Sequence, residues 1–148
     1  MRAVVTRVSS ASVTVSEEIV GEIDKGFLVL LGIKTGDTEA EAKKLADKVC
    51  GLRVFTDDSG QMKSALEDVG GSLLIVSQFT LYGNCKKGRR PEFLEAARPE
   101  TAVPLYEYFI AECKAKGFPV QCGVFGAKMA VTSTNDGPVT LILDTEQL

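Results

Sequence analysis

The sequence predicts an α+β fold, formed by one domain over residues 1–148. We expect a largely antiparallel, curled and barrel-like β-sheet with two main helices. Three observations lead to this prediction. A chain of 148 residues can bury a real core, and it shows no linker or internal repeat. Several short segments have the apolar patterns of strands. The two segments with helical periodicity lie between several strands, which is typical of an α+β domain.

Four segments in the first third of the chain have strand patterns. Residues 3–8 and 11–15 each alternate apolar and polar side chains, with Ser9-Ser10 between them. This alternation predicts two short strands with one solvated face each. Residues 19–23 predict a further short strand. Residues 27–31 are apolar throughout and predict a buried strand.

The segment that begins at Thr38 has the features of an amphipathic helix. Thr38 and Glu41 have the spacing of a capping box, in which each side chain accepts a hydrogen bond from the other residue's amide. Gly51 is well placed to end the helix. The apolar face is formed by residues at i, i+3, i+4 and i+7: Ala42, Leu45, Ala46 and Val49.

A second helix is predicted from Pro99 or Thr101 to Lys116. We expect Pro104 to lie in its first turn, because a proline further along removes a backbone hydrogen bond. The apolar stripe consists of Ala102, Leu105, Phe109 and Cys113.

Between the helices, residues 52–55 predict a strand. Residues 61–70 have a mixed pattern, in which Met62 and Leu66 are expected to cover the sheet. Residues 71–76 are apolar and partly β-branched, and they predict a strand buried on both faces.

The chain contains no histidine. This excludes Ser-His-Asp and Cys-His mechanisms and removes the commonest metal ligand. The four cysteines have no metal-ligand spacing, so we expect no metal and no cofactor. In a hydrolase of this composition, the proton must pass to a carboxylate, a lysine, water or the substrate.

The formal net charge is −3 and the pI is about 5.1. Proteins that bind polyanions in general are usually basic, so the balance argues against DNA as a partner. Lys86-Lys87-Gly88-Arg89-Arg90 is a local exception, either a solvated loop or a phosphate contact. The longest apolar run, residues 27–33, is too short to cross a bilayer. Without an export signal, and with isolated thiols, the chain is expected to be cytoplasmic with no membrane partner.

Two stretches stand out as candidate sites. The central strand ends in Ser77-Gln78-Phe79-Thr80, where polar side chains and backbone amides gather; they are either satisfied locally or form a site. Asn135-Asp136-Gly137-Pro138 joins two strands expected near 128–134 and 139–143. Turn chemistry alone explains its composition. A Gly-Pro bond can also be cis at a cost of about 0.5–1 kcal/mol, which would turn two neighbouring carbonyls the same way.

Together, the strings 77–81 and 135–140 resemble the D-aminoacyl-tRNA deacylases. The resemblance covers nearly the whole chain. It also includes residues 7–15, 26–32 and 70–81, Arg90-Pro91 with Phe93, and Phe125-Gly126-Ala127 with Met129.

This resemblance implies a chiral-proofreading hydrolase that acts on the 3′ end of aminoacyl-tRNA. It would cleave the ester of D-aminoacyl-tRNA, and of glycyl-tRNA mischarged on tRNA(Ala), and release free amino acid and tRNA. It would be a homodimer with its active site at the subunit interface. L-aminoacyl-tRNA would be rejected through a Gly-cisPro motif.

The resemblance also assigns roles to residues. Ser77, Gln78, Phe79 and Thr80 would be catalytic, with the backbone amides of Phe79 and Thr80 as an oxyanion hole. The 2′-OH of the terminal adenosine would assist the attacking water. Thr80 would have a positioning role, because nothing beside it is evident that could activate its hydroxyl.

The substrate-binding residues implied by the resemblance come from three regions. Gly137 and Pro138 of the other subunit would occupy the space of an L side chain, and Arg7 would hold their carbonyls. Taken alone, Arg7 could equally be a solvated residue of an alternating strand. The pocket would be lined by Ala102, Phe125 and Met129, each of which could also be ordinary core packing.

Two other interpretations stay open. The first is a nucleic-acid-binding module that uses the basic cluster, residues 86–90, and the second is a general hydrolase with Thr80 as nucleophile.

Three residues depart from the family pattern at the pocket rim. Lys63, Val124 and Lys128 stand where asparagine, arginine and aspartate are common.

Overall fold

The computed structural model describes all residues, 1–148. Its main sheet has the order β2-β1-β3-β6-β7, with β8 paired to β1, while β4 and β5 form a separate two-stranded sheet. The α+β class and the two main helices are therefore confirmed. The elements are β1 (Arg2–Val15), β2 (Glu18–Ile23), β3 (Gly26–Gly32), α1 (Glu39–Gly51), β4 (Arg53–Thr56), β5 (Met62–Ala65), β6 (Ser72–Ser77), the 3₁₀ turn η1 (Phe79–Tyr82), α2 (Pro99–Ala115), β7 (Val120–Cys122), β8 (Ala130–Asp144) and the 3₁₀ turn η2 (Thr145–Gln147).

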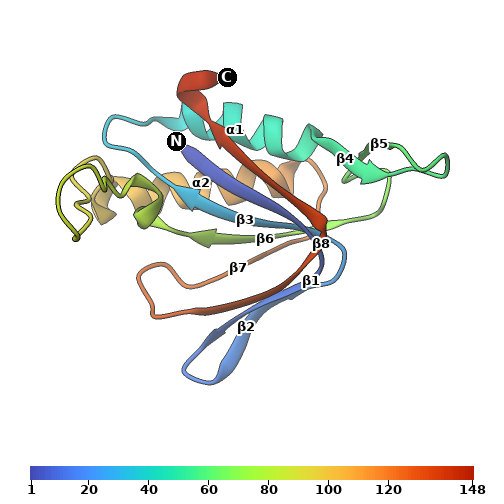
Figure 1. The fold of residues 1–148 in the computed structure, drawn as a ribbon, viewed down its shortest axis with the longest axis horizontal. Helices are drawn as coiled ribbons and strands as arrows, with labels where there is room; N and C mark the ends of the chain where they lie inside the picture. Colours follow the sequence, from blue (N-terminus) through green and yellow to red (C-terminus); the bar gives the residue numbers. More distant parts are fainter.

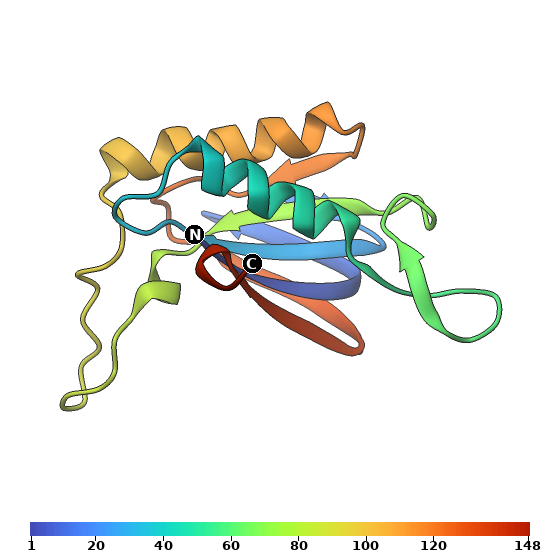
Figure 2. The same cartoon turned by 90° about the horizontal axis from the view of Figure 1, so that it is seen from above.

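Both helices cover the same face of the main sheet (Figures 1 and 2). The larger core, of 23 buried residues, lies between the helices and the sheet, and a second cluster of 7 lies on the opposite face. Strand β6 contributes to both, with Leu73 and Ile75 in the larger core and Leu74 and Val76 in the smaller one. The predicted burial of this strand on both faces is therefore confirmed.

The main sheet curls because β1 changes partner along its length. Residues 2–8 of β1 pair with β3, residues 11–15 pair with β2, and β8 follows β1 along its other edge. These pairs are antiparallel, whereas β3–β6 and β6–β7 are parallel. At the far side β2 packs closely on β7, since a Cβ built on Gly21 would lie 2.8 Å from the Cys122 carbonyl oxygen. The sheet is thus mixed and close to a barrel.

The prediction of two separate strands at the N-terminus was wrong. The exposed pair Ser9-Ser10 lies inside one continuous strand, β1. Its register with β8 shifts between Thr6 and Val8 and again between Val8 and Ser10. Such irregularities bend a strand and increase its twist without ending the pairing, so the chain curls here instead of turning back.

The prediction of two separate strands at the C-terminus was also wrong. Residues 130–144 form one strand, β8, and both of its halves pair with β1. Asn135-Asp136-Gly137-Pro138 is therefore not a hairpin turn between neighbouring strands. Thr6 pairs with Thr140 and Val8 pairs with Asn135, so residues 136–139 bulge out opposite a single residue of β1.

The helices follow the prediction with one correction. The capping box of Thr38 and Glu41 is present, and α1 extends through Gly51. In α2, Pro99 occupies the first turn, where its missing N–H costs nothing, but Pro104 lies beyond that turn and inside the helix. The expected first-turn position of Pro104 was wrong because the helix starts at the earlier of its two candidate residues. Neither helix has the length and apolarity needed to cross a membrane.

Two smaller features differ from the prediction. Leu66 is fully buried, as expected, but Met62 is 50% exposed and does not cover the sheet. The short strand β7 was not expected, because three residues are too few to show a period.

Candidate functional site

A cavity of about 230 Å³ opens where β6 ends and α2 begins. Seven of the predicted site residues meet there: Ser77, Gln78, Phe79, Thr80, Ala102, Phe125 and Met129. Five more residues complete the lining: Leu31, Ile33, Ala97, Gly126 and Ala127. The predicted catalytic string and the predicted pocket residues are thus neighbours in space, although up to 52 positions separate them in the sequence.

The chain turns sharply at the mouth of this cavity. The Gln78 amide donates to the Leu31 carbonyl at 2.8 Å, as in a parallel sheet, and the 3₁₀ turn η1 begins at the next residue. This turn rests directly on Gly32 of β3. A Cβ at Gly32 would lie 3.1 Å from the Gln78 carbonyl oxygen and 3.0 Å from the Cβ of Leu81. The missing side chain therefore lets the turn approach the end of β3.

The first two amides of η1 have no partner within the chain. The amide groups of Phe79 and Thr80 donate to no backbone or side-chain acceptor, and no side chain caps the turn. The first N–H groups of a helical turn are left free in this way by its geometry. Two adjacent main-chain donors are therefore available on residues that line the cavity.

The Thr80 hydroxyl is held by its neighbour and faces no base. Gln78 Nε2 donates to Thr80 Oγ1 at 3.0 Å. None of the twelve lining residues carries a side chain that titrates near neutral pH. The cavity consequently offers hydrogen-bond donors and apolar surface, without a side-chain acid or base that could activate Thr80.

The part of the lining formed by Phe125 and Met129 is apolar and tightly packed. Tyr106 of α2 donates from its hydroxyl to the Ile75 carbonyl at 2.9 Å, and its ring lies 5.7 Å from that of Phe125. Burial raises the pKa of Tyr106 well above its usual range, so it remains a neutral donor. Met129 crosses Gly123 so closely that a Cβ there would lie 2.6 Å from its sulfur. These contacts fix the positions of Phe125 and Met129.

The three remaining predicted residues form a second cluster. Arg7 is 8% exposed; its Nε donates to the Asp136 carbonyl at 3.0 Å and its NH1 to the Val54 carbonyl at 2.7 Å. A side chain on Gly137 would meet the Arg7 guanidinium, with Cβ 2.7 Å from NH2. Arg7 therefore binds the carbonyl before Gly137 and packs on Gly137 itself; it does not bind the Gly137 and Pro138 carbonyls, which the resemblance had implied.

The bulge of β8 is clamped from its other side by Asn135. Its side-chain oxygen accepts from the Val139 amide at 3.0 Å, and its side-chain nitrogen donates to Thr140 Oγ1 at 2.9 Å. The Gly137-Pro138 peptide within this bulge is cis, and Gly137 has a φ of +126°. Asn135 was not among the predicted site residues, although its place in the string 135–140 could have indicated it.

Within one chain, the two clusters lie well apart on the sheet. Ser77 pairs with Leu31, which pairs with Ala3, whereas the bulge lies beside Arg7, four residues further along β1. Four residues correspond to about 13 Å along a strand, and three strand spacings between β8 and β6 add about 14 Å across the sheet. The structure does not bring Gly137-Pro138 to the cavity of its own chain.

The basic cluster lies on the segment that directly follows η1. Asn84 and Glu92 exchange backbone hydrogen bonds of 2.8 and 3.0 Å, which closes a hairpin with Gly88 at a φ of +67°. We call residues 84–92 the basic hairpin. Its four cations are exposed and form no ion pair: Lys86, Lys87, Arg89 and Arg90.

The lining residues missed by the prediction lie mostly at the end of β3 or just after it, and in the loop between β7 and β8. Leu31 and Ile33 line the cavity because β3 pairs in parallel with β6, a pairing that no local pattern reveals. The residues that depart from the family pattern lie outside the lining. Lys63 lies on β5, away from the cavity, and Val124 and Lys128 flank lining residues without lining it themselves.

Comparisons with known proteins agree with this geometry. The family model described as D-Tyr-tRNA(Tyr) deacylase matches residues 4–144. The D-aminoacyl-tRNA deacylase of Thermus aquaticus is 58% identical over 147 residues, covering 99% of this chain and 97% of the relative. That of Desulfotalea psychrophila is 53% identical over 148 residues, covering 100% and 99%.

Two solved structures share the fold. A c-Myc DNA unwinding element binding protein superposes with a TM-score of 0.92 at 41% identity, covering 97% of this chain and 98% of the other. A probable eukaryotic D-amino acid tRNA deacylase superposes with a TM-score of 0.83 at 17% identity, covering 96% and 97%. The chain therefore belongs to the D-Tyr-tRNA(Tyr) deacylase family, a family of D-aminoacyl-tRNA hydrolases.

Proposed function

We propose that this hydrolase edits aminoacyl-tRNA in the cavity at the end of β6. Its substrates are the esters of D-aminoacyl-tRNA and of glycyl-tRNA mischarged on tRNA(Ala), and its products are free amino acid and tRNA. The observation that carries this proposal is the pair of unpartnered amides, Phe79 and Thr80, in a cavity without a titratable side chain. With aminoacyl-tRNA as substrate, the protein would act in the cytoplasm.

In the proposed mechanism, a hydroxyl group of the substrate takes the place of the side-chain base that the cavity lacks. The two amides bind the carbonyl oxygen of the ester and stabilise the negative charge that develops on it; each such donor is typically worth ~3–4 kcal/mol. The vicinal 2′-OH of the terminal adenosine orients and activates the attacking water. Thr80, held by Gln78, positions the reacting groups.

The proposed chiral filter is the Gly-cisPro motif in the bulge of β8. Its main-chain carbonyls occupy the place of an L side chain, which excludes L-aminoacyl-tRNA sterically, whereas glycine and D-residues fit. The clamps by Arg7 and Asn135 support a bulge rigid enough for this task. Since the motif lies far from the cavity of its own chain, it acts in the cavity of a second copy.

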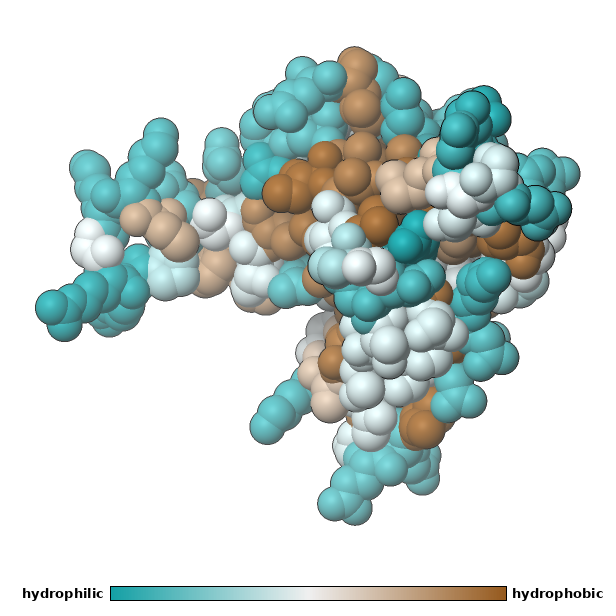
Figure 3. All heavy atoms as spheres, turned by 45° about the vertical axis from the view of Figure 1, so that its right-hand side comes forward, coloured by the Kyte–Doolittle hydropathy of each residue, from teal (hydrophilic) through white to brown (hydrophobic).

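A homodimer is therefore part of the proposal. Large apolar side chains on β2 and β8 are exposed in the single chain, which supports a second copy covering this surface. They are Ile19 at 59%, Val20 at 39%, Val131 at 39% and Ile142 at 73%. Apolar residues also gather over the centre of the face drawn in Figure 3, with hydrophilic side chains around them. Burial of such surface on association removes apolar area from water.

The basic hairpin is the proposed contact with the tRNA backbone. Its four cations are free of carboxylates and project from a segment that leaves the cavity directly. Phe79 packs edge-on against Phe93 beyond the hairpin, with ring centroids 5.1 Å apart, which ties this segment to the cavity. Phosphate contacts of this kind position a nucleic acid without reading its sequence.

The oxyanion role is tested by Phe79→Pro, which deletes one amide hydrogen. Proline fits the first position of a helical turn, and Gln78 before it already has the extended backbone that proline requires. We expect kcat on D-tyrosyl-tRNA to fall roughly 10²–10³-fold. Phe79→Ala is the matched control, since it removes the ring and keeps the amide. Equal activity of both variants would contradict the proposal.

The substrate range is tested with tRNA charged with D-tyrosine, L-tyrosine or glycine. Release of D-tyrosine and glycine but not of L-tyrosine is expected. Equal rates for the two enantiomers would refute the chiral filter. A D-aminoacyl ester on a 3′-end that lacks the 2′-OH should react poorly, which tests the assistance by the substrate.

Two other functions remain to be separated from this one. A related structure is described as a DNA-binding protein, and the basic hairpin favours a nucleic-acid-binding role as well. That role predicts salt-sensitive binding of uncharged RNA or DNA that is independent of ester turnover.

A hydrolase with Thr80 as nucleophile predicts near-total loss of activity in Thr80→Ala, whereas the mechanism proposed above predicts a modest loss.

A further inference from the structure

The far end of η1 is tied to the two terminal strands by one side chain. Arg2 of β1 donates from NH1 to the Leu81 carbonyl at 2.7 Å. Its guanidinium carbon also lies 4.6 Å from the centre of the Tyr82 ring. Leu81 and Tyr82 are the last residues of η1, where the carbonyls of a helical turn lack partners within the turn. Arg2 thus supplies a donor that the short turn cannot supply itself.

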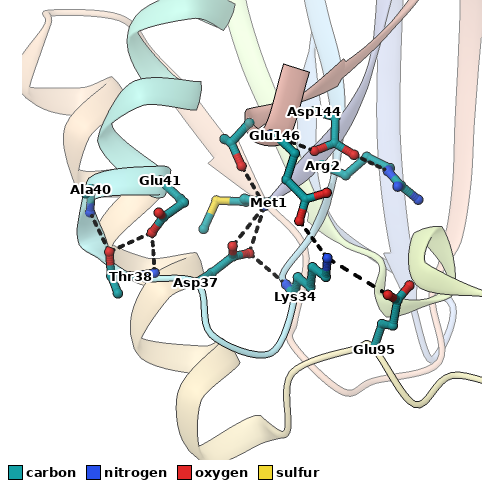
Figure 4. A network of polar contacts seen from close by, with 11 residues as sticks. Met1, Arg2, Lys34, Asp37, Thr38, Ala40, Glu41, Glu95, Asp144 and Glu146 are labelled. Atoms are coloured by element: carbon teal, nitrogen blue, oxygen red, sulfur yellow. Dashed lines mark hydrogen bonds and ion pairs between the residues drawn. The ribbon is translucent and has the colours of Figure 1, made fainter. Parts of the chain in front are cut away.

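Arg2 is itself held by a buried carboxylate. Its Nε donates to Asp144 Oδ2 at 3.0 Å, and the two residues are register partners on β1 and β8. The other oxygen of Asp144 accepts from the Glu146 amide at 3.0 Å. Figure 4 shows Arg2 and Asp144 facing each other at the edge of a polar cluster that also contains Met1, Lys34 and Asp37. Asp144 is 6% exposed, so the guanidinium is fixed in direction and does not sweep through solvent.

The same turn is anchored at its near end by the bond from Gln78 to Leu31. The two free amides, on Phe79 and Thr80, lie between these anchors. Tyr82 is 3% exposed and its hydroxyl has no hydrogen-bond partner, so the turn gains no polar anchor from that side chain. Arg2 is consequently the polar side-chain contact that fixes the end of the turn.

We infer that Arg2 is a positioning residue for hydrolysis: by holding the Leu81 carbonyl, it sets the direction of the Phe79 and Thr80 amides toward the reacting carbonyl. Arg2 does not touch the substrate. The inference rests on the proposed oxyanion role of these amides. It assigns to β1 and β8, the first and last strands of the chain, a part in the chemistry at the end of β6.

Arg2→Gln is the direct test, with D-tyrosyl-tRNA as substrate. Arg2 is not among the residues that line the cavity, so KM should stay within about twofold. We expect kcat to fall roughly 10-fold or more, because small misplacements of reacting groups cost up to 10²-fold. Arg2→Lys keeps a cation beside Asp144 and should recover part of kcat. Arg53→Gln is the matched control: Arg53 also donates to a main-chain carbonyl, that of Lys63 at 2.6 Å, but on the β4–β5 hairpin. It should leave kcat unchanged.

Amide hydrogen exchange gives a second readout that does not depend on activity. The amides of Leu81 and Gly83 are bonded within the turn, to Gln78 and Thr80, and should lose protection in Arg2→Gln. Reduced protection together with lower kcat supports the inference. Unchanged protection and kcat in a folded variant overturn it and leave the proposed function standing. Reduced protection with unchanged kcat overturns both the inference and the oxyanion role of the turn.

Discussion

Gly137 shows at the residue scale how a backbone position can be reserved for glycine. Its φ of +126° is strained for any L side chain, and a Cβ would lie 2.7 Å from the Arg7 guanidinium. Both effects act in the bulge that is proposed to exclude L-amino acids. We therefore expect a methyl group at this position to change both the stability of the protein and its selectivity between L- and D-aminoacyl-tRNA.

Gly137→Ala is expected to lower the free energy of unfolding by about 1–3 kcal/mol, since strained backbone of this kind costs that amount. It should also displace the bulge and raise the rate on L-tyrosyl-tRNA relative to D-tyrosyl-tRNA. Urea unfolding and single-turnover deacylation measure the two effects. Gly60→Ala is the control, because Gly60 has a φ of +84° with no atom within 4 Å of the added Cβ. If both variants kept the same enantiomer ratio as the unmodified protein, the bulge would not be the filter.

At the scale of single elements, α1 depends on its capping box. Glu41 accepts from the Thr38 amide and hydroxyl, each at 2.6 Å, and Thr38 Oγ1 accepts from the Ala40 amide at 3.2 Å. The hydrogen bonds from the Thr38 side chain and backbone hold the pKa of Glu41 below its usual range. A carboxylate with a lowered pKa contributes stability above its unfolded pKa, and this contribution is lost as the pH falls through the folded pKa.

Thr38→Ala should therefore lower the free energy of unfolding at pH 7 by about 1 kcal/mol. The difference from the unmodified protein should shrink as the pH falls below about 4.3, the ordinary pKa of glutamate. Denaturant unfolding at pH 7 and near pH 3 checks both statements. A difference that stayed constant across this range would show that Glu41 takes no part in the cap.

The basic hairpin is an element whose proposed role lies in the salt dependence of binding. Replacing its four cations with glutamine should weaken tRNA binding and flatten the slope of log K against log salt concentration by roughly 0.7–0.9 for each phosphate that the variant no longer neutralises. Hydrolysis of bound substrate should continue, because the hairpin lies outside the cavity lining. Lys43, Lys44 and Lys48 of α1 are the matched control; their replacement should leave the slope unchanged. An unaltered slope in the hairpin variant would contradict the proposed role in tRNA binding.

The elements also show what sequence patterns can and cannot predict. The apolar run of β6 predicted burial on both faces, because a continuous run of this length has no solvated face wherever it pairs. The string 135–138 has the composition of a turn, yet the chain continues along β1 as one strand. Whether such a string becomes a hairpin or a bulge depends on a distant partner strand. Leu31 and Ile33 were missed at the cavity for the same reason, since they lie there only through strand order.

At the scale of the whole molecule, the separation of the two clusters predicts a shared active site. A chain with Phe79→Pro is expected to have an inactive cavity and an intact bulge. A chain with Gly137→Ala is expected to have an active cavity and an altered bulge. Mixing and refolding the two should form heterodimers in which the intact bulge faces the intact cavity. Hydrolysis of L-tyrosyl-tRNA by the Gly137→Ala chains should then fall as the other chain is added, while hydrolysis of D-tyrosyl-tRNA persists.

Light scattering should give twice the mass of the 15.9 kDa chain. A stable monomer that still discriminates between enantiomers would show that one chain suffices. If mixing did not change the rate of L-tyrosyl-tRNA hydrolysis, the filter would have to lie in the same chain as the cavity. That result would contradict the separation of the two clusters along and across the sheet.

The unpartnered amides of η1 have a consequence for how this protein can change over time. A peptide N–H belongs to nineteen of the twenty residue types, so almost any substitution at Phe79 or Thr80 preserves the donor and alters only what surrounds it. In the proposed mechanism, the reaction therefore tolerates most substitutions at these two positions, and proline is the one replacement that removes the donor. The pocket walls are free to adapt to new amino acids while the chemistry stays fixed.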